Sequence, residues 1–298
     1  MNCILCRTPD PKQIGGVSTH ALKQVWKEKY DIVVDPYFTT EALTNYKCDS
    51  CRLDFYHPQS PGDDKLYEKL QVYDWYYEEN KWEFRAAIDL LNEFGRGTAL
   101  EIGCGTGNFL QRLRRAGFDK VTGVDSNEKA LETARAASIE VYPDLAALGD
   151  RRFDYVFAFQ VLEHVPDPRA FMETLTGLLA PGGRLLIAVP NQEGFVGENA
   201  NNELNQPPHH CSRFGEFTLR AAAGFLPVRC ERILVEPLAP HHIDWFVSTK
   251  MLRLQAASRQ LSRLAWKTIA PLASLALKQE RVRRLFKGHT ILAVYRLN

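Results

Sequence analysis

The sequence predicts an α/β fold in which a seven-stranded, mostly parallel sheet carries helices on both faces. From residue 98 onward, short apolar runs alternate with helical patterns, and a glycine-rich turn at 101–107 joins the first run to a helix. Two Cys-x2-Cys pairs near the N-terminus predict a small additional unit, and a basic segment predicts a helical insertion between the sixth and seventh strands. The 298 residues are enough for one large domain and a smaller unit.

The expected strands are apolar runs bounded by turn residues, at 99–102, 121–124, 139–142, 153–159, 184–189, 226–236 and 289–297. Helices are expected between them, at 109–116, 128–137, 168–179 and 216–223. The turn Pro181-Gly182-Gly183 introduces the fifth strand. In sheets of this kind, ligands bind beyond the carboxyl ends of the strands.

The first unit, residues 1–60, contains Cys3, Cys6, Cys48 and Cys51. Two Cys-x2-Cys pairs are typical of a structural Zn²⁺ site, because four thiolates close the tetrahedral shell. The alternative is four unrelated thiols, since the two pairs lie far apart in the sequence. Cysteines in this pattern, without an apolar secretory segment, lead us to expect a cytoplasmic protein.

Residues 61–97 are expected to form a linker, at Pro61-Gly62-Asp63-Asp64, and a helical lid with helical character from 65 to 94. Aromatic residues crowd positions 73–77. They either pack against the following domain or cover a bound cofactor. That domain, residues 98–298, includes the basic helical insertion at 240–287.

The glycine-rich turn is the main candidate for ligand binding. Gly103, Gly105 and Gly107 permit positive φ and let a ligand lie against bare backbone, and the following helix offers unpaired N–H groups. Glu101 adds a carboxylate for a positive charge. A ligand with a cation and an anion close together, such as an amino acid head group, fits this pattern.

Two acids follow the next strands. Asp125 can accept hydrogen bonds from a ribose diol, and Asp144 can meet an adenine amino group. Alternatively, each acid caps the next helix. A dinucleotide site would need a third glycine at position 108, where Asn108 stands. The pattern therefore favours an adenosyl amino acid.

Residues 98–191 resemble class I S-adenosylmethionine-dependent methyltransferases, which have a Rossmann-like fold. The resemblance rests on EIGCGTG at 101–107, VD at 124–125, Asp144, FDYVFAFQVLEHVPDP at 153–168 and LAPGGRLLIAVPN at 179–191. The cysteine pairs, YEKL at 67–70 and WYYEENKWEF at 75–84 are similar to a narrower group. That group carries a zinc-ribbon segment before the methyltransferase domain and is frequent among sugar- and polysaccharide-modifying enzymes.

The resemblance implies S-adenosylmethionine as cofactor. The glycines would face its methionine portion, Glu101 its ammonium group, Asp125 the ribose and Asp144 the adenine. Residues 160–162 would line the cofactor. The expected cofactor-binding residues are Glu101, Gly103, Gly105, Gly107, Asp125, Ser126, Asp144, Gln160 and Leu162.

Histidines are the candidates for a base, which is needed only if the acceptor loses a proton as it attacks. The expected catalytic residues are His164, His209 and His210. His164 alternatively fixes its loop by hydrogen bonding. His241 and His242 form a weaker candidate pair, and Arg213 either binds an acidic substrate group or caps local structure.

The basic insertion concentrates positive charge. Residues 250–287 contain ten Lys or Arg residues and one acid, a net charge of +9, so the remainder carries −8 within the overall +1. Three interpretations of this insertion are open: a helical flap packed on the domain, a segment that contacts a membrane surface, or a segment that contacts nucleic acid. We expect peripheral contact at the inner face of the membrane to be its function if it has one. The low overall charge argues against nucleic acid.

These observations predict transfer of a methyl group to a small-molecule or saccharide acceptor, in polysaccharide, lipid-linked sugar or secondary-metabolite biosynthesis. The alternatives are an RNA methyltransferase, a quinone or phenol O-methyltransferase, and a non-catalytic S-adenosylmethionine-binding regulator. Gln160-Val161-Leu162-Glu163 stands where an exocyclic-amino methyltransferase carries a proline-aromatic motif. The choice among acceptors stays open.

Overall fold

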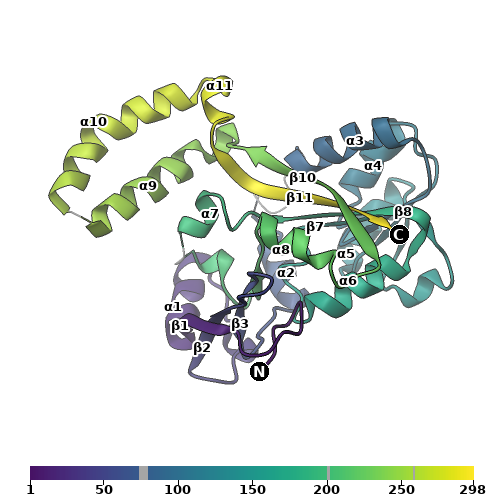
Figure 1. Ribbon diagram of the computed structural model, residues 1–298, viewed down its shortest axis with the longest axis horizontal. Coiled ribbons are helices and arrows are strands. Elements are labelled where there is room, and N and C mark those ends of the chain that lie inside the picture. The colour runs from purple at the N-terminus through teal and green to yellow at the C-terminus, as the bar shows by residue number, and fades with distance from the viewer. Residues whose placement is uncertain (74–79, 200–201, 258) are drawn as a thin grey trace.

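The central sheet has seven strands in the spatial order β10-β11-β8-β7-β4-β5-β6. Strands β10, β11, β8 and β7 are labelled in Figure 1. The computed structural model describes residues 1–73, 80–199, 202–257 and 259–298. Strands β4 to β8 pair in parallel, whereas β11 runs antiparallel to both of its neighbours. The predicted α/β fold with a mostly parallel seven-stranded sheet is thus confirmed. Its strands are β4 (Ala99–Ile102), β5 (Val121–Val124), β6 (Glu140–Tyr142), β7 (Phe153–Phe159), β8 (Leu179–Pro190), β10 (Val228–Pro237) and β11 (Lys287–Leu297).

Helices cover both faces of this sheet. One apolar cluster packs α3, α4 and α5 against one face, and a second packs α6 and α8 against the other. Strand β7 contributes Tyr155 and Phe157 to the first cluster and Val156 and Ala158 to the second, which explains its nearly continuous apolar sequence. The helices are α3 (Trp82–Phe94), α4 (Asn108–Arg115), α5 (Glu128–Ala136), α6 (Pro168–Gly177) and α8 (Glu216–Ala222).

The predicted turn before the fifth strand lies inside β8. The register pairs Phe153 with Leu179 and then Tyr155 with Arg184, so the four residues between form a bulge. Gly182, at φ +72°, supplies the left-handed conformation that this bulge needs. Strand β8 therefore begins five residues before the predicted start.

The N-terminal unit is a second, four-stranded sheet in the order β1-β2-β3-β9. The segment between the cysteine pairs contains β1 (Lys12–Ser18), α1 (Thr19–Tyr30), the 3-10 turn η1 (Asp35–Tyr37) and β2 (Ala42–Lys47), and β3 (Asp54–His57) follows. Strand β9 (Ser212–Arg213) comes from the larger domain and pairs with β3. The two units therefore share a sheet, although they lie far apart in the sequence.

The predicted linker is ordered by hydrogen bonds. Asp63 caps α2 (Asp64–Leu70) by accepting from Leu66 N–H at 3.1 Å, and Gly62 N–H donates to Pro208 C=O at 2.6 Å. Within the predicted helical stretch 65–94, the structure describes two helices, α2, which begins in the predicted linker and ends at Leu70, and α3. Of the aromatic cluster, Trp75, Tyr76 and Tyr77 lie outside the described residues.

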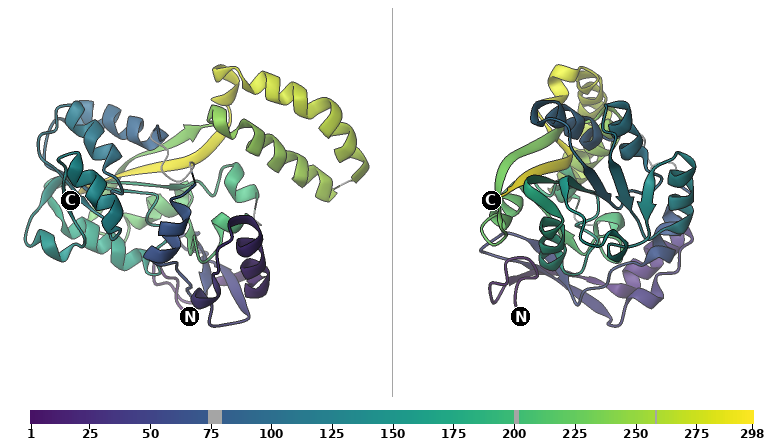
Figure 2. Two further views of the ribbon diagram at one scale, coloured as in Figure 1. Left: turned by 180° about the vertical axis from the view of Figure 1, so that it is seen from behind. Right: turned by 90° about the vertical axis from the view of Figure 1, so that its right-hand side faces the viewer.

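The basic insertion is a helical hairpin that projects away from the sheet (Figures 1 and 2). The turn η4 (Pro240–His242) leads into α9 (Ile243–Ala257), which is followed by α10 (Arg259–Leu277) and α11 (Glu280–Arg283). From the sequence, Pro271 is expected to interrupt the helix of the basic insertion, and this expectation is wrong, because Pro271 lies inside α10. A proline removes one helix hydrogen bond, and packing along α9 offsets that cost. None of the helices in the described part of the chain has the length and apolar character needed to cross a bilayer.

Three short elements complete the chain. The turn η2 (Ala146–Leu148) follows β6, and α7 (Phe195–Glu198) and η3 (Glu203–Asn205) follow β8. The last two lie on the path from the carboxyl end of β8 to the segment around His209 and His210. They therefore help to position two of the predicted catalytic histidines.

A substitution at Gly123 tests the packing behind the glycine-rich turn. A Cβ here would lie 2.5 Å from Cys104 Sγ and 2.8 Å from Leu110 Cδ1. We expect Gly123→Ala to lower the free energy of unfolding, measured by urea denaturation, by about 1–3 kcal/mol through overpacking. Gly177→Ala is the matched control, because no described neighbour lies within 4 Å of a Cβ there. Equal effects of the two substitutions would contradict this account.

Candidate active site

The glycine-rich turn joins β4 to α4 and has the predicted backbone conformation. Gly103, Gly105 and Gly107 have φ values of +73°, +50° and +75°. A Cβ on Gly103 would lie 2.6 Å from Val161 Cγ2, so bare backbone is required there. Gly103 N–H donates to Val124 C=O at 2.8 Å, which ties the turn to the end of β5.

Glu101 lies buried beneath this turn, with an exposed fraction of 3%. Its Oε2 atom has no hydrogen-bond partner among the described residues. Burial raises the pKa of this carboxyl well above its usual range, and the Lys81 ammonium opposes that shift. An unpaired buried carboxylate is costly, and a bound ammonium group would relieve that cost. The turn and this carboxylate together fit the methionine end of S-adenosylmethionine.

Asp125 lies at the end of β5 and lines a large cavity. Its Oδ2 accepts from Gly105 N–H at 2.8 Å, and its Oδ1 accepts from Asn127 N–H at 2.9 Å. Burial raises the pKa of Asp125 in spite of these two donors. Ser126 also lines the cavity, and its hydroxyl donates to Asp64 at 2.5 Å.

The remaining predicted cofactor residues occupy different environments. Asp144 is exposed, and its Oδ1 accepts from Ala147 N–H at 3.0 Å, which is the capping alternative; its contact with adenine stays a prediction. Gln160 lines the cavity with φ +55° and donates to Glu83 at 3.1 Å. Leu162 is fully buried in the core, and its contact with the cofactor stays a prediction.

The cavity has a volume of about 1420 Å³ and lies beyond the carboxyl ends of the strands. Six of the chain's eight histidines line it: His164, His209, His210, His241, His242 and His289. The structure brings the three predicted catalytic histidines together. Ring centroids lie 4.7 Å apart for His164 and His209, 4.8 Å for His164 and His210, and 4.4 Å for His209 and His210.

All three rings are anchored through Nδ1. His164 Nδ1 lies 2.6 Å from His209 C=O, His209 Nδ1 lies 2.8 Å from Leu204 C=O, and His210 Nδ1 lies 3.2 Å from Asn205 Oδ1. Each Nδ1 atom faces a carbonyl oxygen, which can only accept, so Nδ1 carries the proton and Nε2 keeps its lone pair. His164 Nδ1 also lies 3.1 Å from the Tyr67 hydroxyl oxygen. Burial lowers the pKa of His164 to about 3 and that of His209 to about 4, so both rings are neutral at neutral pH.

Sequence reasoning missed several groups in this cavity. Glu163 is buried, and neither of its carboxylate oxygens has a hydrogen-bond partner among the described residues. Burial raises the pKa of Glu163 to about 8. Burial also lowers the pKa of His289 to about 4 and raises that of Glu236 to about 7. The adjacency of Glu163 to His164 was the available signal; His289 and Glu236 look like ordinary strand ends.

Arg213 is pinned inside the protein. It is buried, lies 4.0 Å from Asp54 and donates to the Tyr56 hydroxyl. These contacts favour the structural interpretation of Arg213 over binding of an acidic substrate group.

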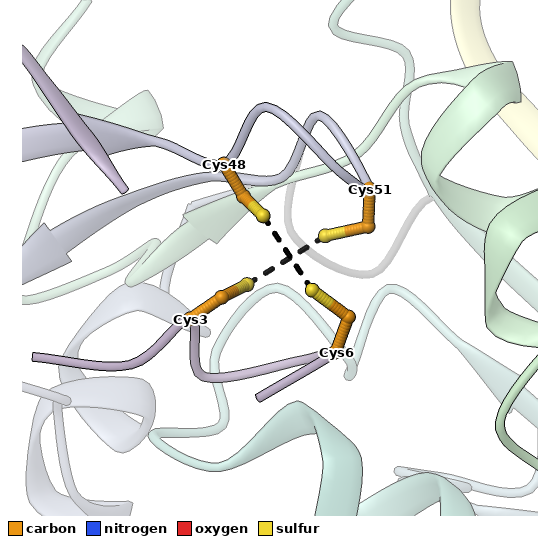
Figure 3. Close-up of side chains that lie close together, drawn as sticks. All are labelled: Cys3, Cys6, Cys48 and Cys51. Atoms are coloured by element: carbon orange, nitrogen blue, oxygen red, sulfur yellow. Dashed lines mark hydrogen bonds between the residues drawn. The ribbon is translucent and has the colours of Figure 1, made fainter. Parts of the chain in front are cut away.

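The four N-terminal cysteines form a compact cluster (Figure 3). The sulfur atoms lie 3.6 Å apart for Cys3 and Cys51 and 3.5 Å apart for Cys6 and Cys48. Sulfur atoms around a tetrahedral Zn²⁺ with Zn–S of about 2.3 Å would lie roughly 3.8 Å apart. The expected four-cysteine cluster is confirmed.

The two turns of this cluster have the same backbone pattern. Arg7 and Arg52 have φ values of +64° and +58°, and their N–H groups donate to Cys3 C=O at 3.1 Å and Cys48 C=O at 2.8 Å. Each pair thus presents its thiols from the same kind of turn.

Residues 78–224 match the family model described as a methyltransferase domain. A ubiquinone biosynthesis O-methyltransferase of Caulobacter sp. (strain K31) is 39% identical over 103 residues, or 31% of this chain and 40% of the relative. A tRNA U34 carboxymethyltransferase of Idiomarina loihiensis is 28% identical over 169 residues, or 51% of this chain and 49% of the relative. The chain spans less than half the length of these curated relatives.

Among solved structures, magnesium protoporphyrin IX methyltransferase from Synechocystis PCC 6803 with bound SAH is similar with a TM-score of 0.48 and 16% sequence identity. The similarity covers 72% of this chain and 82% of that one.

Proposed function

Because this chain carries a class I S-adenosylmethionine-dependent methyltransferase domain, we propose that it transfers a methyl group to a hydroxyl of a small-molecule acceptor bound in the histidine-lined cavity. The observation that carries this proposal is the cluster of His164, His209 and His210, whose neutral rings border the cavity beside the glycine-rich turn. S-adenosylmethionine supplies an electrophilic methyl group on a sulfonium.

The chain's own residues would bind and orient both reactants. The glycines and Glu101 would hold the methionine end, and Asp125 the ribose. An Nε2 lone pair would accept a hydrogen bond from the acceptor hydroxyl and aim its oxygen at the methyl carbon. As the oxygen–carbon bond forms, the sulfur–carbon bond breaks, the sulfonium becomes a neutral thioether and the hydroxyl proton passes to that Nε2 atom.

The acceptor hydroxyl is best described as phenolic. Imidazoles whose pKa values are lowered to about 3 and 4 are weak bases, so they suit a hydroxyl as acidic as a phenol, with a pKa of roughly 10. The ubiquinone biosynthesis O-methyltransferases among the relatives fit this alternative. The expected role in polysaccharide biosynthesis receives no support from the relatives.

We also propose that the four-cysteine cluster binds a structural Zn²⁺. Its support is the donor set and the 3.5 and 3.6 Å sulfur separations. A closed thiolate shell leaves no open coordination position, so this ion would fold the N-terminal unit and take no part in catalysis. Through the β3–β9 pairing, it would also steady the segment that carries His209 and His210.

A methyl-transfer assay tests the catalytic proposal. We expect labelled S-adenosylmethionine to methylate an acceptor from a panel of phenols, sugars and fractionated extract. His164→Gln should reduce the rate by about 10²–10⁴-fold, through loss of proton-transfer assistance, with cofactor affinity retained. His241→Gln is the control from the same cavity. Cofactor binding without transfer to any acceptor would instead support the non-catalytic regulator.

We also propose that the α9–α10 hairpin contacts a membrane surface, whichever acceptor the protein methylates. Residues 250–287 carry a net charge of +9, and α10 exposes Ile269, Leu272 and Leu275 by 55%, 67% and 62%. Basic helices with exposed apolar side chains bind the interface of anionic bilayers. Such contact would suit an acceptor that resides in the membrane.

Vesicle sedimentation tests this contact. The full chain should co-sediment with vesicles that contain anionic lipid, and less so at high salt, because salt screens the attraction. Leu272→Glu with Leu275→Glu should release it, whereas Ile14→Glu, at an exposed position on β1, should not. Absence of co-sedimentation at low salt would contradict membrane contact and support the alternative, in which the hairpin is a helical flap of the domain.

A further inference from the structure

The three predicted catalytic histidines have the geometry of a metal-ligand set, and we call them the imidazole triad. One ring nitrogen from each of His164, His209 and His210 lies within 4.8 Å of the other two. All three rings line the cavity. The triad joins two distant segments, because Cys211 N–H and Ser212 N–H donate to Glu163 C=O at 2.8 and 3.3 Å.

The hydrogen bonds of the triad match those of ligating histidines. A metal-bound imidazole almost always donates its second ring N–H to a carbonyl or carboxylate oxygen, which fixes the tautomer and the ring orientation. Each ring of the triad has a carbonyl oxygen at Nδ1, supplied by His209, Leu204 and Asn205. The three Nε2 lone pairs are therefore the ones available to a shared ligand.

A second observation points to a cation at this position. Glu163 is 1% exposed, and neither carboxylate oxygen has a hydrogen-bond partner among the described residues. Its Oε1 atom lies 3.9 Å from His164 Nε2. Three protonated imidazoles this close together would repel one another, so a single bound cation is the better partner for the carboxylate.

We propose that the imidazole triad binds one divalent transition-metal ion of the Zn²⁺ type, with an open coordination position facing the cavity. Three histidines and an open position are the ligand set of catalytic zinc, in contrast to the closed four-cysteine cluster. Its role in catalysis rests on the proposed function: the acceptor hydroxyl would occupy the open position. Zinc lowers the pKa of bound water from 15.7 to about 7, and a bound hydroxyl would be acidified likewise.

With the ion bound, the three Nε2 lone pairs of the triad are occupied and can no longer accept the hydroxyl proton as in the metal-free site. The proton of the metal-bound hydroxyl would pass instead to a cavity imidazole outside the triad, His242 or His289. The resulting oxyanion attacks the methyl carbon, an oxygen–carbon bond forms, and the sulfur–carbon bond breaks to leave a neutral thioether. The metal keeps its oxidation state, and no further reactant is needed.

Metal content of the full chain tests the site without reference to activity. After loading with Zn²⁺ and dialysis, we expect two equivalents per chain, one at the cysteines and one at the triad. His164→Gln should retain only one, whereas His241→Gln, from the same cavity, should retain two. Circular dichroism and SAH binding check that the variants are folded.

Cobalt substitution separates the two sites spectroscopically. Thiolate-bound Co²⁺ absorbs strongly in the near ultraviolet through charge transfer, whereas imidazole-bound Co²⁺ gives weaker visible bands. His164→Gln should remove the weaker visible bands of imidazole-bound Co²⁺ and leave the charge-transfer absorption of thiolate-bound Co²⁺ unchanged. Asn205→Ala, which removes the oxygen beside His210 Nδ1, should weaken the second equivalent by about 10–100-fold, as expected of a positioning residue.

These measurements distinguish failure of the proposed metal site from failure of the proposed function. One equivalent with only a thiolate spectrum would overturn the triad site, and methyl transfer by that same protein would leave the proposed function standing. Two equivalents, one of them lost in His164→Gln, would support the triad site even if no acceptor were methylated.

Discussion

The backbone carbonyl of Glu163 is the point on which the site depends. It follows β7, in the loop that carries His164, and accepts from Cys211 and Ser212 N–H at 2.8 and 3.3 Å. Ser212 and Arg213 then pair with β3 of the N-terminal sheet. These few hydrogen bonds bring His209 and His210 against His164, and they join the four-cysteine unit to the acceptor side of the cavity. A site assembled in this way is only as rigid as the small sheet that supports it.

The sequence predicts the sheet well and the acceptor side less well, for a physical reason. Strands such as 153–159 are buried on both faces, so their apolar runs stand out, and the glycine-rich turn requires positive φ at fixed positions. Strand β9 has two residues and no periodicity, and its pairing with β3 depends on the tertiary path. The helix through Pro271 likewise depends on packing along α9, which a local rule does not include.

Two buried carboxyl groups, one beneath the glycine-rich turn and one at the cavity, indicate where a cation can bind. Oε2 of Glu101 at β4 and both carboxyl oxygens of Glu163 after β7 lack hydrogen-bond partners among the described residues, and burial raises the pKa of each group. Such groups lower stability unless a cation binds beside them, so they locate where positive charge is expected. We propose that the first faces the ammonium position of the cofactor, and the second lies beside His164 of the imidazole triad. In this account the acceptor hydroxyl lies between the sulfonium and the triad.

A crystal structure of the full chain with S-adenosylhomocysteine, grown with Zn²⁺ and measured at the zinc absorption edge, tests this account most directly. We expect the ribose on Asp125, the amino group on Glu101, and the sulfur facing the triad across a gap that holds a methyl group and an oxygen at about 3–3.5 Å. We also expect anomalous peaks at both the cysteines and the triad. A ligand whose sulfur points away from His164, or triad rings turned out of the cavity, would contradict it.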